Sequence, residues 1–172
     1  MKEISQFDKE CLKKAINIAK KTFNNGNYPV GAVLSINEEI IDTAGNEVKG
    51  QESLVNHAEN TLIIRNGKKL REISDDQDKI ITLYTTLEPC LQCLGASVVN
   101  CINRILFIEH DPNGGACNLN RDSIGLRYKE FWPKIIHCPI STEPKELMIK
   151  FFKEEIIRGN IEWPSKMLKL LR

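Results

Sequence analysis

Residues 79–108 read KIITLYTTLEPCLQCLGASVVNCINRILFI, and this stretch indicates the fold class. The run 79–85 is rich in β-branched and apolar side chains, which is typical of a strand covered on both faces. A helix is expected over 91–101, and a second buried strand over 104–108. A strand, a helix and a strand in succession indicate a sheet against which helices pack.

The flanking sequence continues this alternation of strands and helices. The other expected elements are a helix over 8–23, an antiparallel hairpin of strands 30–36 and 39–44 joined across Asn37 and Glu38, a helix from about His57, a weaker strand at Ile135 and Ile136, and a helix over 142–158. The sequence therefore predicts an α/β sandwich whose first two strands are antiparallel and later strands parallel. The pattern assigns no element to 111–125 or 163–172.

Length, composition and charge restrict the class of protein. A chain of 172 residues suits one domain, and its 41% hydrophobic and 27% charged residues are typical of a globular protein. The 24 basic and 23 acidic residues argue against a general nucleic-acid coat. No apolar leader opens the sequence and no apolar run approaches a membrane span, so we expect a cytoplasmic protein without a membrane partner. In a reducing cytosol, a Cys-x-x-Cys pair more often binds metal or does redox chemistry than forms a structural disulfide.

Two short segments supply the residue types of a catalytic zinc site. They contain His57, Cys90 and Cys93, and one nitrogen with two sulfurs suits Zn²⁺ and leaves a fourth position open for water. Cys90 and Cys93 are three residues apart, so both thiolates project from the same side of a first helical turn. Pro89 lies where its missing N–H is harmless, and the helix dipole favours thiolates there.

Glu59 is the candidate proton carrier. It lies two residues after His57, so both side chains can address one metal only if their helix directs its N-terminus at the site. Glu59 need not be a ligand, because a carboxylate beside metal-activated water can accept a proton and pass it on. His-x-Glu followed by Pro-Cys-x-x-Cys is the signature of zinc nucleobase deaminases, and residues 57–59 and 89–93 match every fixed position.

The chain resembles the cytidine and deoxycytidylate deaminase superfamily in these segments. The runs 28–34, 45–46, 83–90 and 111–116 look like those of the bacterial tRNA-specific adenosine deaminases, with the guanine deaminases next closest. The resemblance implies a three-layer sandwich with a five-stranded mixed β-sheet and helices on both faces. It also implies a homodimer and a deaminase domain over residues 1–158. The apolar residues of the tail over 159–172 predict that it packs on the domain or on a dimer mate.

The same resemblance implies a reaction and a set of substrate contacts. Water activated by Zn²⁺ would attack the amino-bearing ring carbon of a nucleobase, and Glu59 would protonate the ring nitrogen and then the departing ammonia. The preferred substrate would be adenosine in a tRNA anticodon loop, which becomes inosine. The residues implied in substrate binding are Asn46, Ala58 through its N–H, Pro89 through its carbonyl, and Asp111 in the loop that follows.

Two departures from the adenosine deaminase pattern concern the RNA. Residues 52–56 read ESLVN where those enzymes typically have Asp-Pro-Thr-Ala before His-Ala-Glu. The last long helix has Glu154 and Glu155 after its two phenylalanines, where the family commonly has basic residues, so the sequence places acidic charge where phosphate would approach.

Four other interpretations stay open at this point. The substrate can be a free base or nucleoside such as guanine, guanosine or cytosine. The chain can be a catalytically silent, zinc-binding subunit of a deaminase complex. The cysteines can belong to a structural zinc site completed by Cys101, or Cys90 and Cys93 can be the redox pair of a thiol–disulfide oxidoreductase.

Overall fold

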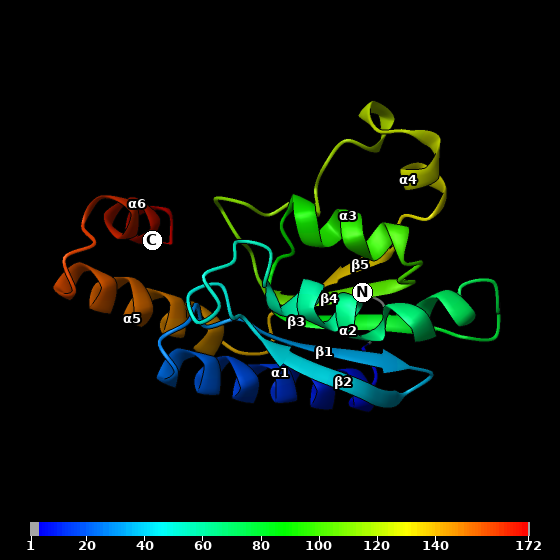
Figure 1. Ribbon diagram of the computed structural model, residues 1–172, viewed down its shortest axis with the longest axis horizontal. Coiled ribbons are helices and arrows are strands. Elements are labelled where there is room, and N and C mark those ends of the chain that lie inside the picture. Colours follow the sequence, from blue (N-terminus) through cyan, green and yellow to red (C-terminus); the bar gives the residue numbers. More distant parts are fainter. Residues whose placement is uncertain (1–3, 172) are drawn as a thin grey trace.

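The computed structural model of the protein describes residues 4–171 and has the α/β architecture that the sequence predicts (Figure 1). Its elements, in chain order, are α1 (Gln6–Asn24), β1 (Gly31–Ile36), β2 (Glu39–Gly45), α2 (Ala58–Glu72), β3 (Ile81–Leu87), α3 (Leu91–Val99), β4 (Arg104–Glu109), a 3₁₀ turn η1 (Arg121–Ser123), α4 (Leu126–Glu130), β5 (Lys134–His137), α5 (Glu143–Ile157) and α6 (Glu162–Leu170).

The five strands form one mixed sheet in the order β2-β1-β3-β4-β5. β1 pairs antiparallel with β2 and with β3, whereas β3–β4 and β4–β5 are parallel pairs, which confirms the predicted mixed sheet. The predicted hairpin turn is present, and its two residues Asn37 and Glu38 have φ values of 47° and 61°. Positive φ at both central residues matches the right-handed twist of the strands that the turn connects.

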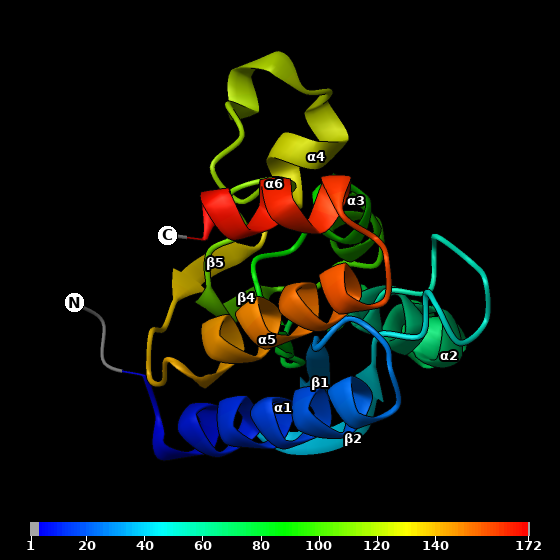
Figure 2. The ribbon, with the colours of Figure 1, turned by 90° about the vertical axis from the view of Figure 1, so that its left-hand side faces the viewer.

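Helices cover both faces of the sheet, as the two views in Figures 1 and 2 show. Alternate residues of each strand serve the two faces: Leu83 of β3 packs in the cluster that contains Leu62 of α2, and Tyr84 packs in the cluster that contains Leu12 of α1. The first six residues of β3 are buried, which confirms the prediction of a strand covered on both faces.

Some boundaries and two short elements differ from the prediction. β3 begins at Ile81 rather than at 79 and continues to Leu87, and α3 ends at Val99 because Cys101 has a φ of 57°, outside the helical region. The segment 111–125 contains η1, whose first turn is capped by the side chain of Asn120. The following helix α4 has only five residues, too few to show helical periodicity in the sequence.

The C-terminal segment forms a helix that packs against α5 of the same chain. Met167 and Leu171 are buried together with Met148, Phe151 and Phe152 of α5. Figure 2 shows α6 running alongside α5 on one side of the molecule. Of the helices within residues 4–171, none is long and apolar enough to cross a membrane.

A buried carboxylate ties α1 to the middle of the sheet. The side chain of Asp8 is 3% exposed, and it accepts hydrogen bonds from the Tyr84 hydroxyl at 2.8 Å and from Arg104 Nη2 at 2.9 Å. Burial by itself would raise the pKa of Asp8, but the hydrogen bonds from Arg104 and Tyr84 hold it below its ordinary value. The ion pair therefore stabilises the folded state wherever Asp8 is ionised.

We expect Asp8→Asn to lower the free energy of unfolding by about 2 to 3 kcal/mol at pH 7, because Arg104 and Tyr84 lose a charged acceptor. A carboxyl whose pKa is lowered by folding contributes stability above its unfolded pKa of about 3.9, and this contribution is lost as the pH falls through the folded value. The gap between wild type and variant in urea unfolding should therefore close below about pH 4. A gap of constant size down to pH 2 would contradict this role.

Candidate metal centre and active-site cavity

Two helices begin at the same place and direct their N-termini at it. His57 is the N-cap residue of α2, and Cys90 is the N-cap residue of α3, which follows directly after β3. Cys93 lies in the first turn of α3, as the spacing predicts. The partial positive charge at the end of each helix favours thiolates and a carboxylate at this point.

The three proposed metal ligands come together. Their ligand atoms all lie within 4.8 Å of one another: each cysteine Sγ is 3.5 Å from His57 Nδ1, and the two Sγ atoms are 3.7 Å apart. Zinc–sulfur and zinc–nitrogen bonds of about 2.3 and 2.0 Å at tetrahedral angles require separations of about 3.8 Å for the sulfurs and about 3.5 Å for sulfur and nitrogen. The spacing therefore fits one tetrahedral Zn²⁺ with a fourth position left over.

The electrostatics of the two thiols also favour a bound cation. The Cys93 thiol donates to Cys90, and although burial opposes ionisation, this bond and His57 hold the pKa of Cys90 at about 4. The bond to Cys90, followed by burial and the Glu59 charge, raises the pKa of Cys93. Two thiolates at this distance repel each other, so only a bound dication lets both ionise. Neither cysteine is in a disulfide, and Cys101 takes no part in the cluster.

Glu59 lies beside the cluster as a buried carboxyl group. It is 4% exposed, its Oε1 accepts a hydrogen bond from Thr85 Oγ1 at 3.0 Å, and its Oε2 is 3.6 Å from Cys93 Sγ. Burial raises the pKa of Glu59 above its ordinary value. A carboxyl that is held in place and gains a proton readily is suited to carrying that proton between two positions.

The cluster and Glu59 open into a cavity of about 250 Å³. Of the residues expected at the substrate, Asn46 and Asp111 also line this cavity, whereas Ala58 and Pro89 do not. Asn46 Oδ1 accepts from the Val48 N–H at 3.0 Å, and its amide nitrogen has no hydrogen-bond partner within residues 4–171. The carbonyl of Pro89 accepts from the Ala116 N–H at 3.0 Å, so one of its two lone pairs is in use.

Glu88 is a cavity residue to which the motif argument assigned no role. It is buried, its Oε1 accepts from the Cys117 N–H at 2.9 Å, and its Oε2 lies 2.8 Å from His110 Nδ1. Gly115 packs so closely on it that a Cβ there would lie 2.5 Å from the Glu88 carboxyl carbon. Glu88 therefore holds the loop that carries Asp111 against the site. A charged residue at the end of a buried strand was the signal for this role.

The C-terminal helices provide an apolar wall that could not be predicted from the sequence. Met148 and Phe152 of α5, together with Trp163 and Met167 of α6, line the same cavity. The only sequence signal was the apolar spacing of the tail, which does not say where that helix docks.

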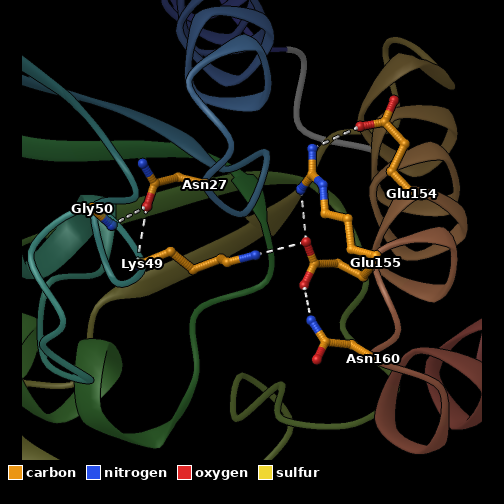
Figure 3. Close-up of polar contacts among 7 residues, drawn as sticks. Asn27, Lys49, Gly50, Glu154, Glu155 and Asn160 are labelled. Atoms are coloured by element: carbon orange, nitrogen blue, oxygen red, sulfur yellow. Dashed lines mark hydrogen bonds and ion pairs between the residues drawn. The ribbon is translucent and has the colours of Figure 1, made fainter.

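The acidic pair near the end of α5 does not present two free charges to solvent, which corrects the expectation drawn from Glu154 and Glu155. The Glu155 side chain is 8% exposed and is paired with Lys49 Nζ at 2.6 Å and Arg158 Nη1 at 2.8 Å (Figure 3). Glu154 pairs with Arg158 at 3.5 Å. A buried carboxylate needs such partners, and sequence spacing cannot show that Lys49 supplies one from 106 residues away.

Comparisons with known proteins agree with this site. The family model described as the cytidine and deoxycytidylate deaminase zinc-binding region matches residues 5–109, which include His57, Glu59, Cys90 and Cys93. The chain is 31% identical over 147 residues to the tRNA-specific adenosine deaminase of Bacillus subtilis (strain 168), covering 86% of this chain and 89% of that protein.

Two solved structures share the fold at similar levels of identity. One, from work on A-to-I editing by tRNA:A34 deaminases at the wobble position of transfer RNA, is 25% identical with a TM-score of 0.64 and covers 81% of this chain and 99% of the other. The other, a guanine deaminase from Bacillus subtilis, is 30% identical with a TM-score of 0.54 and covers 62% and 66%. The chain belongs to the zinc-binding family of the cytidine and deoxycytidylate deaminases and is a hydrolytic deaminase.

Proposed function

We propose that this deaminase converts adenosine to inosine in the anticodon loop of a tRNA. The observation that carries the chemistry is the tetrahedral spacing of His57, Cys90 and Cys93, with the Glu59 carboxyl buried beside them. The choice of adenosine in tRNA is supported by the similarity to tRNA-specific adenosine deaminases over most of both chains.

In this proposal His57, Cys90 and Cys93 hold the zinc ion. When bound, zinc would lower the pKa of a coordinated water to about 7 and thereby supply a nucleophile at neutral pH. Three protein ligands would leave a fourth position of the ion open for water. Because His57 and Cys90 line the cavity, a substrate in the cavity would lie beside the metal site.

Glu59 moves the protons of the reaction. It accepts one from the attacking water and delivers it to the ring nitrogen next to the amino-bearing carbon, and it then transfers the second proton to the amino group, which leaves as ammonia. One water is consumed, the C–N bond breaks, and a keto oxygen remains on the ring. The bond from Thr85 to Oε1 holds the carboxyl in position, which leaves Oε2 for these transfers.

The cavity residues orient the base. Asn46 follows the last residue of β2 and is buried in the cavity wall. Its amide nitrogen can donate a hydrogen bond to a ring nitrogen of the base, or to an oxygen of the base or the ribose. Asp111 reaches the cavity from the loop that Glu88 anchors. The mostly apolar remaining wall excludes water from competing hydrogen bonds, which strengthens these few polar contacts.

Guanine is the second candidate substrate, because the guanine deaminase from Bacillus subtilis is 30% identical to this chain over 62% of it, against 31% over 86% for the adenosine deaminase of the same species. The buried amide of Asn46 suits either purine. A homodimer stays a prediction from the family resemblance, and a cytoplasmic location stays a prediction from the sequence.

Cys90→Ser should lose the metal, because a serine hydroxyl is a much poorer zinc ligand than a thiolate. We expect elemental analysis to find about one zinc ion per chain in the wild type and far less in the variant. Cys101→Ser is the matched control, since Cys101 lies outside the cluster, and it should keep its zinc. Full zinc occupancy in Cys90→Ser would show that the ligand set is wrong.

Glu59→Gln should keep zinc and lose the reaction. Glutamine preserves the shape of the side chain and an acceptor for Thr85, but it cannot exchange protons, so ammonia release should fall by about 10² to 10⁴-fold. The control is Glu130→Gln on the exposed helix α4, which should match wild type. If Glu59→Gln retained near-normal turnover, another group would carry the protons.

A screen of ammonia release tests the substrate. The panel consists of an RNA stem-loop with adenosine in its anticodon loop, the same stem-loop with guanosine in that place, and free adenosine, guanine, guanosine and cytosine. We expect the adenosine stem-loop to be deaminated fastest and to yield inosine. Faster ammonia release from guanine would show that guanine, the second candidate, is the preferred substrate. No release from any of them by zinc-loaded protein would favour a catalytically silent subunit.

A further inference from the structure

The cavity has one wall that lies outside the segment shared with the family model. That segment ends at residue 109, whereas Trp163 and Met167 of α6 line the same cavity as His57 and Glu59. The part of the chain after β5 therefore contributes to the space that receives the substrate.

α6 is held in this place by a packed cluster and by a buried ion pair. Met167 is 4% exposed and lies against the apolar residues of α5, and the ring of Tyr28 lies 4.7 Å from the ring of Phe151. Glu155 accepts a hydrogen bond from Asn160 in the α5–α6 turn at 2.8 Å and pairs with Lys49 (Figure 3). These contacts fix both the turn before α6 and the buried side of the helix.

Lys49 connects the same network to the segment between β2 and α2. Its N–H and that of Gly50 both donate to Asn27 Oδ1, at 3.0 and 2.9 Å, while its ammonium reaches Glu155 (Figure 3). That segment begins with Asn46 and ends at His57, so the substrate-facing amide and the metal ligand lie on a segment tied to α5. The contacts of Lys49 and Glu155 therefore connect the turn before α6 to the segment that carries Asn46 and His57.

The two α6 residues that line the cavity differ in exposure. The exposed fraction of Trp163 is 44%, against 4% for Met167. The Lys166 ammonium lies over the indole ring of Trp163, 5.7 Å from the ring centroid. A large, partly uncovered aromatic ring at the wall of a cavity of this size is suited to a flat heterocycle, because every nucleobase offers a π-face to stack on.

We propose that Trp163 contacts the base of the substrate directly and that α6 thereby sets the affinity of the site for nucleobases. This proposal rests on the proposed function, since it takes a nucleobase as the substrate. The zinc ligands and Glu59 act at the amino-bearing carbon, and Trp163 packs on the ring or on its edge. The contact is made on binding and persists through the reaction, so it lowers KM more than it raises kcat.

Steady-state kinetics of zinc-loaded variants test the contact. Trp163→Ala should raise KM for the best substrate of the ammonia screen by roughly tenfold, the size expected for loss of one base–aromatic stack, with little change in kcat. Trp163→Phe should recover most of this loss, because an aromatic ring remains. The control is Leu170→Ala, an exposed residue of the same helix that does not line the cavity, and it should match wild type. Lys166→Ala should leave KM close to the wild-type value, which would show that the effect belongs to the indole and not to its neighbouring charge.

A binding measurement that needs no turnover distinguishes this proposal from the proposed function. The chain has two tryptophans, so Trp132→Phe leaves Trp163 as the only indole fluorophore. Titration of this zinc-loaded variant with free adenosine and, separately, with guanine should quench or shift its emission at saturating base. If wild type releases ammonia from no substrate, the proposed function fails and this titration alone decides the role of Trp163.

Two results would overturn the proposal. One is a Trp163→Ala variant with wild-type KM on a substrate that is turned over. The other is an emission spectrum of Trp132→Phe that no base changes. Equal zinc content and an unchanged thermal midpoint across the variants would show that neither result comes from misfolding.

Discussion

The structure depends on two helix N-termini that meet at one end of the sheet. α2 starts at His57 and α3 starts at Cys90, and only this meeting brings a nitrogen and two sulfurs to separations of 3.5 to 3.7 Å. Helices that start together add their positive ends, which stabilises thiolates and the Glu59 carboxyl in a buried place. If either helix were shifted by one turn, about 5.4 Å, the tetrahedral spacing would be lost.

The sheet makes this meeting rigid. β3 is buried on both faces, leads directly into α3, and also supplies Thr85, whose hydroxyl holds Glu59. The same strand end carries Glu88, which anchors the loop of Asp111. One strand therefore positions Cys90, the Glu59 carboxyl and part of the cavity wall, and small displacements of β3 would shift all three at once. The Asp8 ion pair, which joins α1 to Tyr84 of β3 and Arg104 of β4, contributes to this rigidity from the opposite face.

Much of the fold and the cluster of His57, Cys90 and Cys93 could be predicted from the sequence, because both depend on local patterns. The alternation of apolar runs predicted the five strands and the main helices, and the turn residues Asn37 and Glu38 predicted the hairpin. Residue types at short spacing within two segments predicted that His57, Cys90 and Cys93 form one cluster and that Glu59 lies beside it, and the structure places them so. The short helix α4 could not be predicted, because five residues are too few for a periodic signal. The role of Glu155 could not either, because its partner Lys49 is distant in the sequence.

The amino-acid sequence by itself determined which atoms can do the chemistry: an imidazole, two thiols and a carboxyl group on the first turns of two helices that follow strands. Local spacing suffices for this, because three or four residues along a helix return to the same side. Only the tertiary structure decided what surrounds those atoms. The burial of Glu155 depends on Lys49, which lies more than 100 positions away in the sequence. The docking of α6 on α5 and the placement of Trp163 in the cavity wall depend on which surface the amphipathic helix packs against, and its sequence does not specify that surface. An apolar stripe on a helix specifies that this face is buried. The shape of the rest of the protein specifies which surface the face packs against.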